Sequence, residues 1–145
     1  MLTPPRHILL LTMLALTAAM LPGCSELRVA GSSTRVYAAD FTGAAKTCDA
    51  AKVVPLEGKP IEATMKLRND GGWCALSVAR GGKPYDSALL TGRASHGKVF
   101  IHRVGDETRI DYTPDRGYAG PDTFTVKLIP GDAVIEAAVT VTGGS

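Results

Sequence analysis

The stretch IEATMKLRNDGGWCALSV, residues 61–78, decides the expected fold. In its first half apolar residues alternate with polar ones, and this places one apolar set on a single face of a strand: Ile61, Ala63, Met65 and Leu67. The NDGG turn at 69–72 suits a tight reversal with positive φ, and the alternation resumes over 74–78. The stretch therefore predicts two consecutive strands, each with one buried face and one solvated face.

The same alternation recurs downstream, while helical periodicity is absent. The further strand-like segments are 97–103, 108–114, 122–130 and 134–142, separated by turns rich in Gly and Pro. Six or seven short strands at regular spacing favour an all-β antiparallel sandwich, with a small barrel as the alternative. The 145 residues have room for one domain of ordinary size.

The N-terminus differs in kind from the rest of the chain. A basic start is followed by a run without charge over residues 8–21, which is shorter than the ~20 residues that a spanning helix needs. The next residues, LPGCS at 21–25, resemble the lipobox of bacterial lipoproteins. The resemblance implies that residues 1–23 are a cleaved signal peptide and that Cys24 is lipidated. The alternative is an ordinary secretory leader in which Cys24 has no special role.

Residues 24–46 are small, polar and rich in Ala and Gly, so we expect a flexible tether there, ending in one edge strand. Such a tether would span ~25 Å. The domain itself is expected over residues 47–143. In the lipoprotein family, Ser rather than Asp after the lipidated Cys favours the outer membrane, which makes its periplasmic face the expected location.

If Cys24 is lipidated, Cys48 and Cys74 remain as a pair in an oxidising compartment. The simplest expectation is a disulfide, which on the chain-entropy estimate stabilises the fold by about 3.5 kcal/mol. No CxxC or HxxxH spacing supports zinc, and a His partner for a catalytic Cys cannot be located from sequence.

The second half resembles the bacterial Ig-like, cadherin-like modules over residues 89–142. The resemblance starts at a His96-Gly97 turn and continues through seven fold-motif positions: Tyr112, Pro114, Gly117, Tyr118, Gly120, Asp122 and Phe124. It implies an Ig-like sandwich in which these residues have structural roles. Asp122 is expected to bond amides of its own loop, and Tyr118 to act like a tyrosine corner. Such modules serve adhesion, spacing and ligand binding alike.

Nothing in the composition or motifs indicates an enzyme. The 16 basic and 14 acidic residues are nearly balanced and form no basic stripe, so a nucleic-acid partner is not expected. Hydrolase, metalloprotease and P-loop motifs are absent, and we expect no catalytic residue and no cofactor. We also expect no metal, because acidic residues are scattered singly. His96 is interpreted as a turn residue and His102 as solvent-facing.

Trp73 has two interpretations. It caps a neighbouring loop, or it is an exposed anchor for a partner. If the protein is a binder, we expect Trp73 or Tyr85 to anchor the contact, flanked by Arg80 and Lys83. The loops at 69–74, 80–86 and 115–122 are the candidate docking segments.

The resulting expectation is a non-catalytic, lipid-anchored module of the bacterial cell envelope that binds a protein or a wall polymer. Two alternatives stay open. One is a structural spacer without a ligand, and the other is a small inhibitor of a periplasmic hydrolase.

Overall fold

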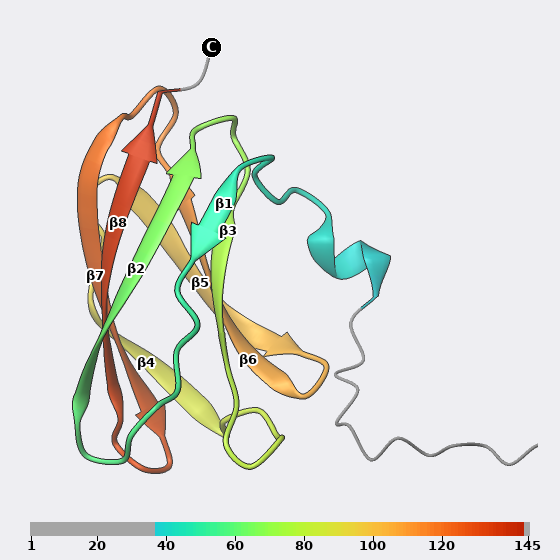
Figure 1. Cartoon of the computed structure of the whole chain (residues 1–145), viewed down its shortest axis with the longest axis vertical. Coiled ribbons are helices and arrows are strands. Elements are labelled where there is room, and N and C mark those ends of the chain that lie inside the picture. Colours follow the sequence, from blue (N-terminus) through green and yellow to red (C-terminus); the bar gives the residue numbers. More distant parts are fainter. Residues whose placement is uncertain (1–36, 144–145) are drawn as a thin grey trace, which may run out of the picture. The chain divides into compact units, whose positions relative to one another are not determined.

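The computed structural model describes residues 37–143 (Figure 1). The predicted signal peptide at 1–23, the predicted lipidation site Cys24 and the part of the tether before residue 37 lie outside the described residues.

The described residues form one turn of 3-10 helix and eight strands, two more than the six alternating segments that the sequence marks most clearly. Their bounds are η1 Ala38–Phe41, β1 Cys48–Ala50, β2 Pro60–Arg68, β3 Cys74–Val78, β4 Ser87–Gly92, β5 Gly97–Val104, β6 Glu107–Pro114, β7 Gly120–Ile129 and β8 Val134–Thr142. The expected edge strand near the end of the tether is wrong, because the chain there forms η1.

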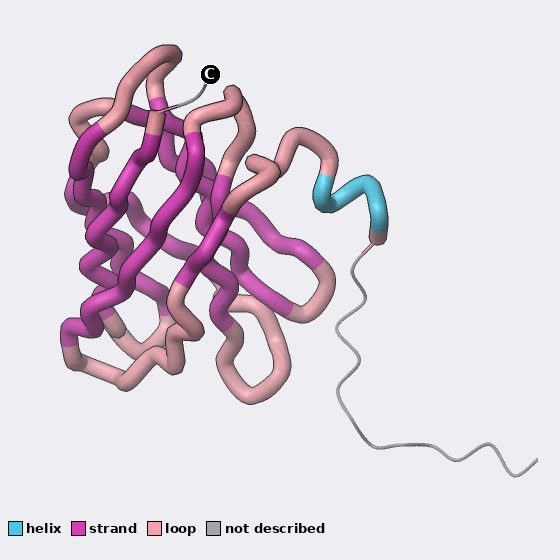
Figure 2. Tube along the Cα trace, turned by 45° about the horizontal axis from the view of Figure 1, so that its top comes forward, coloured by secondary structure: helices cyan, strands magenta, loops and turns pink. Residues whose placement is uncertain are grey.

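The strands form two sheets, which confirms the predicted all-β sandwich (Figure 2). One sheet has the order β1-β2-β8-β7-β4 and the other the order β3-β6-β5. All pairs of neighbouring named strands are antiparallel except β2 and β8, which run parallel from Pro60 opposite Val134 to Arg68 opposite Thr142. The parallel pair joins the first long strand to the last one.

The predicted alternation places the core correctly. Inward residues of both sheets are buried, and the largest fully buried side chains include Tyr112, Phe124, Met65, Leu67, Leu76, Ile110, Leu128 and Ile135. Burying a side chain of this size contributes about 1.5–3 kcal/mol. The interleaving of the two inner faces therefore supplies most of the hydrophobic stabilisation.

A disulfide joins Cys48 on β1 to Cys74 on β3, as predicted from the cysteine count. β1 belongs to the five-stranded sheet and β3 to the three-stranded sheet, so the bond links the two layers along one side of the sandwich. Cys74 is fully buried while Cys48 is exposed, which places the bond at the edge of the core.

On the other side of the sandwich, the layers are linked by the buried carboxylate of Asp122. It accepts hydrogen bonds at 2.9 Å from the backbone N–H groups of Ser95 and His96, from its neighbour Thr123, and from the hydroxyl of Tyr112. The sequence predicts that Asp122 bonds amides of its own loop, but only the Thr123 N–H is local, and the other three donors come from Ser95, His96 and Tyr112. Asp122 fixes the loop between β4 and β5, where the chain crosses from one sheet to the other.

Two of the candidate docking loops share one end of the sandwich. The side-chain amide of Asn69, in the β2–β3 turn, donates to the carbonyl oxygens of Asp115 and Tyr118 in the β6–β7 loop. Tyr118 donates its hydroxyl to the Pro121 carbonyl at 2.6 Å, which confirms the predicted tie to backbone, and its ring stacks on His96. The third loop, at 80–86, follows the opposite end of β3.

Acid should weaken the fold through Asp122. Burial raises the pKa of this carboxyl, but the N–H donors of Ser95, His96 and Thr123 outweigh that effect and hold the pKa below its ordinary value. A depressed pKa contributes stability that is present above the unfolded pKa of about 3.9 and is lost as pH falls through the folded pKa. The free energy of unfolding, measured in urea, should therefore fall as pH drops below about 4.

The variant Asp122→Asn should lose about 2–4 kcal/mol at pH 7, because an amide cannot accept from all four donors. It should also lose the acid dependence that the carboxylate causes. Asp115→Asn, at an exposed position in the same loop region, is the matched control and should change little. Equal losses in the two variants would contradict this role.

Candidate functional site

The outer face of the three-stranded sheet carries charged residues that are unexpectedly buried. The strand register places Arg109 between Ser77 and His102, and Asp111 between Ala75 and Phe100. Outward positions of a sandwich are normally solvated. Here, however, the side chains of Arg109 and Asp111 are only 9% and 8% exposed.

Asp111 is held by two cationic or potentially cationic groups. The guanidinium of Arg109 donates to both carboxylate oxygens, through Nε at 2.8 Å and Nη2 at 3.2 Å. On the other side, Nε2 of His102 lies 3.0 Å from Oδ2 of Asp111. The sequence interpretation of His102 as merely solvent-facing is therefore incomplete, because its ring is half-buried and paired.

The remaining faces of Arg109 are also satisfied. Its guanidinium carbon lies 4.1 Å from the centre of the Trp73 ring, a cation–π arrangement, and its Nη1 donates to the carbonyl oxygen of Asp40. Among the described residues, no buried side-chain nitrogen or oxygen lacks a hydrogen-bond partner. The ion pair is thus a rigid and fully bonded unit.

The contact with Asp40 shows that the segment 37–46 packs on the sandwich. The N–H of Ala45 donates to the Trp73 carbonyl at 2.8 Å, and the N–H of Trp73 donates to the Gly43 carbonyl at 3.0 Å. The Asp70 carboxylate accepts from the N–H of Lys46, and this bond together with that from Gly72 lowers the Asp70 pKa. Residues 37–46, which the sequence pattern assigns to the tether, therefore contact the sandwich in this structure.

Trp73 itself acts as a cap in this structure. Its indole N–H donates to the Thr42 carbonyl at 3.1 Å, and its half-buried ring lies between Arg109 and the segment 37–46. A hollow of about 360 Å³ opens beside it and is lined by residues including Phe41, Lys46 and Arg109. The first of the two sequence interpretations thus describes its packing.

Two aromatic rings beside this unit stay open to solvent. Phe100 on β5 is 62% exposed, and its ring lies 4.8 Å from that of His102. Phe41, in η1, is 60% exposed and lines the hollow beside Trp73. We call Phe41, Trp73, Phe100, His102 and the Arg109–Asp111 pair the aromatic–ionic face.

The other residues predicted for docking do not join this face. Tyr85 is only 5% exposed and packs in the core, a position that does not suit the hypothesis that its ring anchors a partner. Arg80 forms an ion pair with Glu57 at 2.6 Å, and Lys83 is exposed in the same loop. This loop follows the end of β3 while Trp73 precedes its start, so the four predicted residues do not converge.

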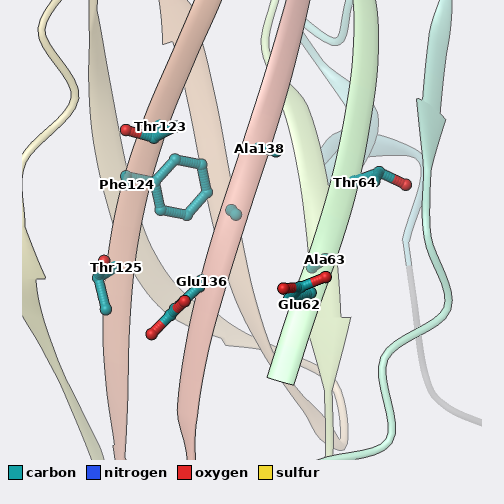
Figure 3. Close-up of a pocket in the computed structure, with 9 residues that line it drawn as sticks. Glu62, Ala63, Thr64, Thr123, Phe124, Thr125, Glu136 and Ala138 are labelled. Carbon is teal, nitrogen blue, oxygen red and sulfur yellow. The ribbon is translucent and has the colours of Figure 1, made fainter. Parts of the chain in front are cut away.

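The hollow in Figure 3 lies on the outer face of the five-stranded sheet. It has a volume of about 480 Å³, and the small side chain of Ala138 lies between threonines of β2 and β7. Glu62 and Glu136 are direct neighbours in the parallel register. Over residues 37–143, His, Cys, Asp and Glu side chains form no group of three or more that could hold a metal ion.

Comparison with known proteins gives no identification: no protein-family model matches this sequence, and no curated protein matches it. Within residues 37–143, no helix is long and apolar enough to cross a membrane.

Replacing Gly72 should detach the segment 37–46. A Cβ at this position would lie 2.4 Å from the backbone nitrogen of Ala45, closer than real Cβ contacts allow. Gly72→Ala should therefore speed tryptic cleavage after Lys46 by at least about tenfold, the effect of about 1.4 kcal/mol on local opening. Gly143→Ala, where a Cβ meets no atom within 4 Å, is the control. Unchanged cleavage in Gly72→Ala would contradict the docking of this segment.

Proposed function

We propose that this chain is a non-catalytic, lipid-anchored module of the bacterial cell envelope that binds a partner protein through its aromatic–ionic face. The observation that carries the proposal is the exposed ring of Phe100 on a rigid base. Its neighbour His102 is fixed by Asp111, and Asp111 is fixed by Arg109.

A pre-ordered aromatic side chain is suited to binding because little conformational entropy remains to be lost. Aromatic and Arg residues are also the types enriched where protein interfaces concentrate their binding free energy. In contrast, the carboxylate of Asp111 is already shared by Arg109 and His102. An arrangement of this kind favours a recognition role over proton transfer.

The Ig-like and lipoprotein assignments are part of the same proposal. The sandwich architecture supports the resemblance to Ig-like, cadherin-like modules, as do the motif contacts of Tyr118 and the burial of Phe124. The lipobox at 21–25 supports lipidation of Cys24, and Ser25 supports the periplasmic face of the outer membrane. Firm attachment needs two or more acyl chains.

Replacing Cys24 tests the anchor. The wild-type protein should fractionate with membranes and begin at a modified Cys24. Cys24→Ala should appear in the soluble fraction or accumulate with its leader uncleaved. Fractionation and mass spectrometry of the N-terminal peptide distinguish these states. Wild-type protein that is soluble and unmodified would contradict the anchor and leave an ordinary secretory leader.

A photoreactive phenylalanine analogue tests the docking face in cells. At position 100 it should give one discrete crosslinked product with an envelope protein. At position 89 it should give none, because Leu89 is similarly exposed but lies on β4 of the other sheet. Phe100→Ser should then weaken co-purification of that protein by at least about tenfold, corresponding to ~1.4 kcal/mol, without changing the free energy of unfolding.

The identity of the product also separates the alternatives. A hydrolase that loses activity when bound would indicate an inhibitor. Equal labelling from positions 100 and 89 would contradict the proposed face. No product from either position would also contradict it and would favour a spacer.

A further inference from the structure

The four sheet edges of the sandwich are unequally protected. β1 is only three residues long and β4 shifts register between Leu90 and Gly92. β3 has five residues, and its start is occupied by the backbone of residues 43–45, which pairs with Trp73, and by the disulfide at Cys74. β5, in contrast, has eight residues in unbroken register with β6, and among residues 37–143 no strand pairs with its other side. A long regular edge presents unpaired N–H and C=O groups that can accept a further strand.

The core is least covered beside this edge. Eight half-buried apolar residues pack against the core, and five of them lie on β4, on β5 or on the loop between them: Ala88, Leu90, Ala94, Val99 and Ile101. Two hollows follow the same line. One of about 280 Å³ reaches from Asp86 to Ile101, and the other, of about 480 Å³, is lined by Leu90 and Val99 among others. We call this line the β4–β5 seam.

The charges along the seam are predominantly basic. Arg93, Lys98 and Arg103 are exposed there, while Asp86 is the acidic residue among those lining the two hollows. Arg103 donates to the backbone carbonyl of Asp86 and, in this bond, not to the Asp86 carboxylate. A ligand for this seam should therefore be apolar in alternate positions and acidic in the others.

We propose that the partner contributes an extended segment of alternating apolar and acidic residues, which adds a strand to β5 and covers the seam. Its backbone would pair with the free edge, and alternate apolar side chains would lie over Val99 and Ile101. Its acidic side chains would lie on the other face of the added strand, where Lys98 projects from β5, and Arg93 and Arg103 add positive charge along the seam. This inference rests on the proposed binding function and adds the chemical class of the partner.

A second copy of this chain fits the edge less well. Antiparallel pairing of β5 with itself would bring Lys98 and Arg103 of both copies onto one short ladder. Cross-strand repulsion between like charges disfavours such a pair. The basic edge thus discriminates against self-association while it attracts an acidic strand.

The test uses the full chain in detergent and a labelled synthetic peptide of the same length as β5, alternating Val and Glu. Fluorescence anisotropy should detect binding with a Kd on the order of 10–100 µM. A Val–Lys peptide should bind at least about tenfold more weakly, and a Val–Glu peptide N-methylated at alternate residues should not bind. The double variant Arg93→Glu/Lys98→Glu, changed only at exposed positions, should reverse the preference between the Glu and Lys peptides.

Hydrogen exchange locates the contact. Binding should slow exchange of alternate amides of β5 and leave those of β1 unchanged. No binding, binding that ignores the peptide charge or N-methylation, or slowed exchange caused by dimerisation of the protein alone would each overturn the inference. Crosslinking from position 100 would persist if only the strand addition were wrong, so the two proposals fail separately.

Discussion

The buried ion pair of Arg109 and Asp111 is the constraint around which one whole face of the molecule is organised. Removing two charges from water costs several kcal/mol per ion unless each hydrogen-bonding position is satisfied. The sheet alone cannot do this on its outer face. The indole of Trp73, the carbonyl of Asp40 and the ring of His102 complete the bonding. Residues 37–46 therefore pack against the outer face of the three-stranded sheet.

The two sheets are held together by different interactions on the two sides of the sandwich. Along β1 and β3 the two sheets are joined covalently by the disulfide, in which Cys74 is fully buried and Cys48 lies opposite the fully buried Leu67. Along β4 and β5 they are joined by polar contacts, from Asp122 at one end and Arg103 at the other. Between these two contacts the apolar side chains stay half-exposed. The more dynamic side of the sandwich is thus expected to be the side with the free edge.

Much of the fold could be predicted because alternation reports directly on which face is buried. The inward set of β2 and the burial of Tyr112 and Phe124 followed from period two and the motif. β1 was missed because three residues carry no period, and β4 because its SALLTG sequence is weakly patterned and its ladder shifts register. The parallel pairing of β2 with β8 depends on strand order, which a local pattern does not contain.

The candidate site was harder to predict for the same reason. Arg109 and Asp111 occupy positions that alternation assigns to solvent, and Arg109 bonds the carbonyl of Asp40, about 70 residues earlier in the chain. Tyr85 looked like a loop residue because Pro and Gly precede it, yet Thr108 bonds its backbone and holds it in the core. The predicted docking set combined residues from both ends of β3. The predicted strand at 74–78 lies between Trp73 and the loop at 80–86, so its length already separates them.

The parallel pairing of β2 and β8 has a consequence for how such domains can be joined. Because β8 runs alongside β2, residue 142 leaves the sheet beside the β2–β3 turn, where the Asn69 N–H donates to the Thr142 carbonyl. After η1, residues 43–45 reach the sandwich beside Trp73 at the start of β3, at the same pole (Figure 1). A filament of head-to-tail modules gains length only when the chain enters at one pole and leaves at the other. Copies joined by short linkers at these two points, residues 43–45 and residue 142, would fold back on each other and would not extend a filament.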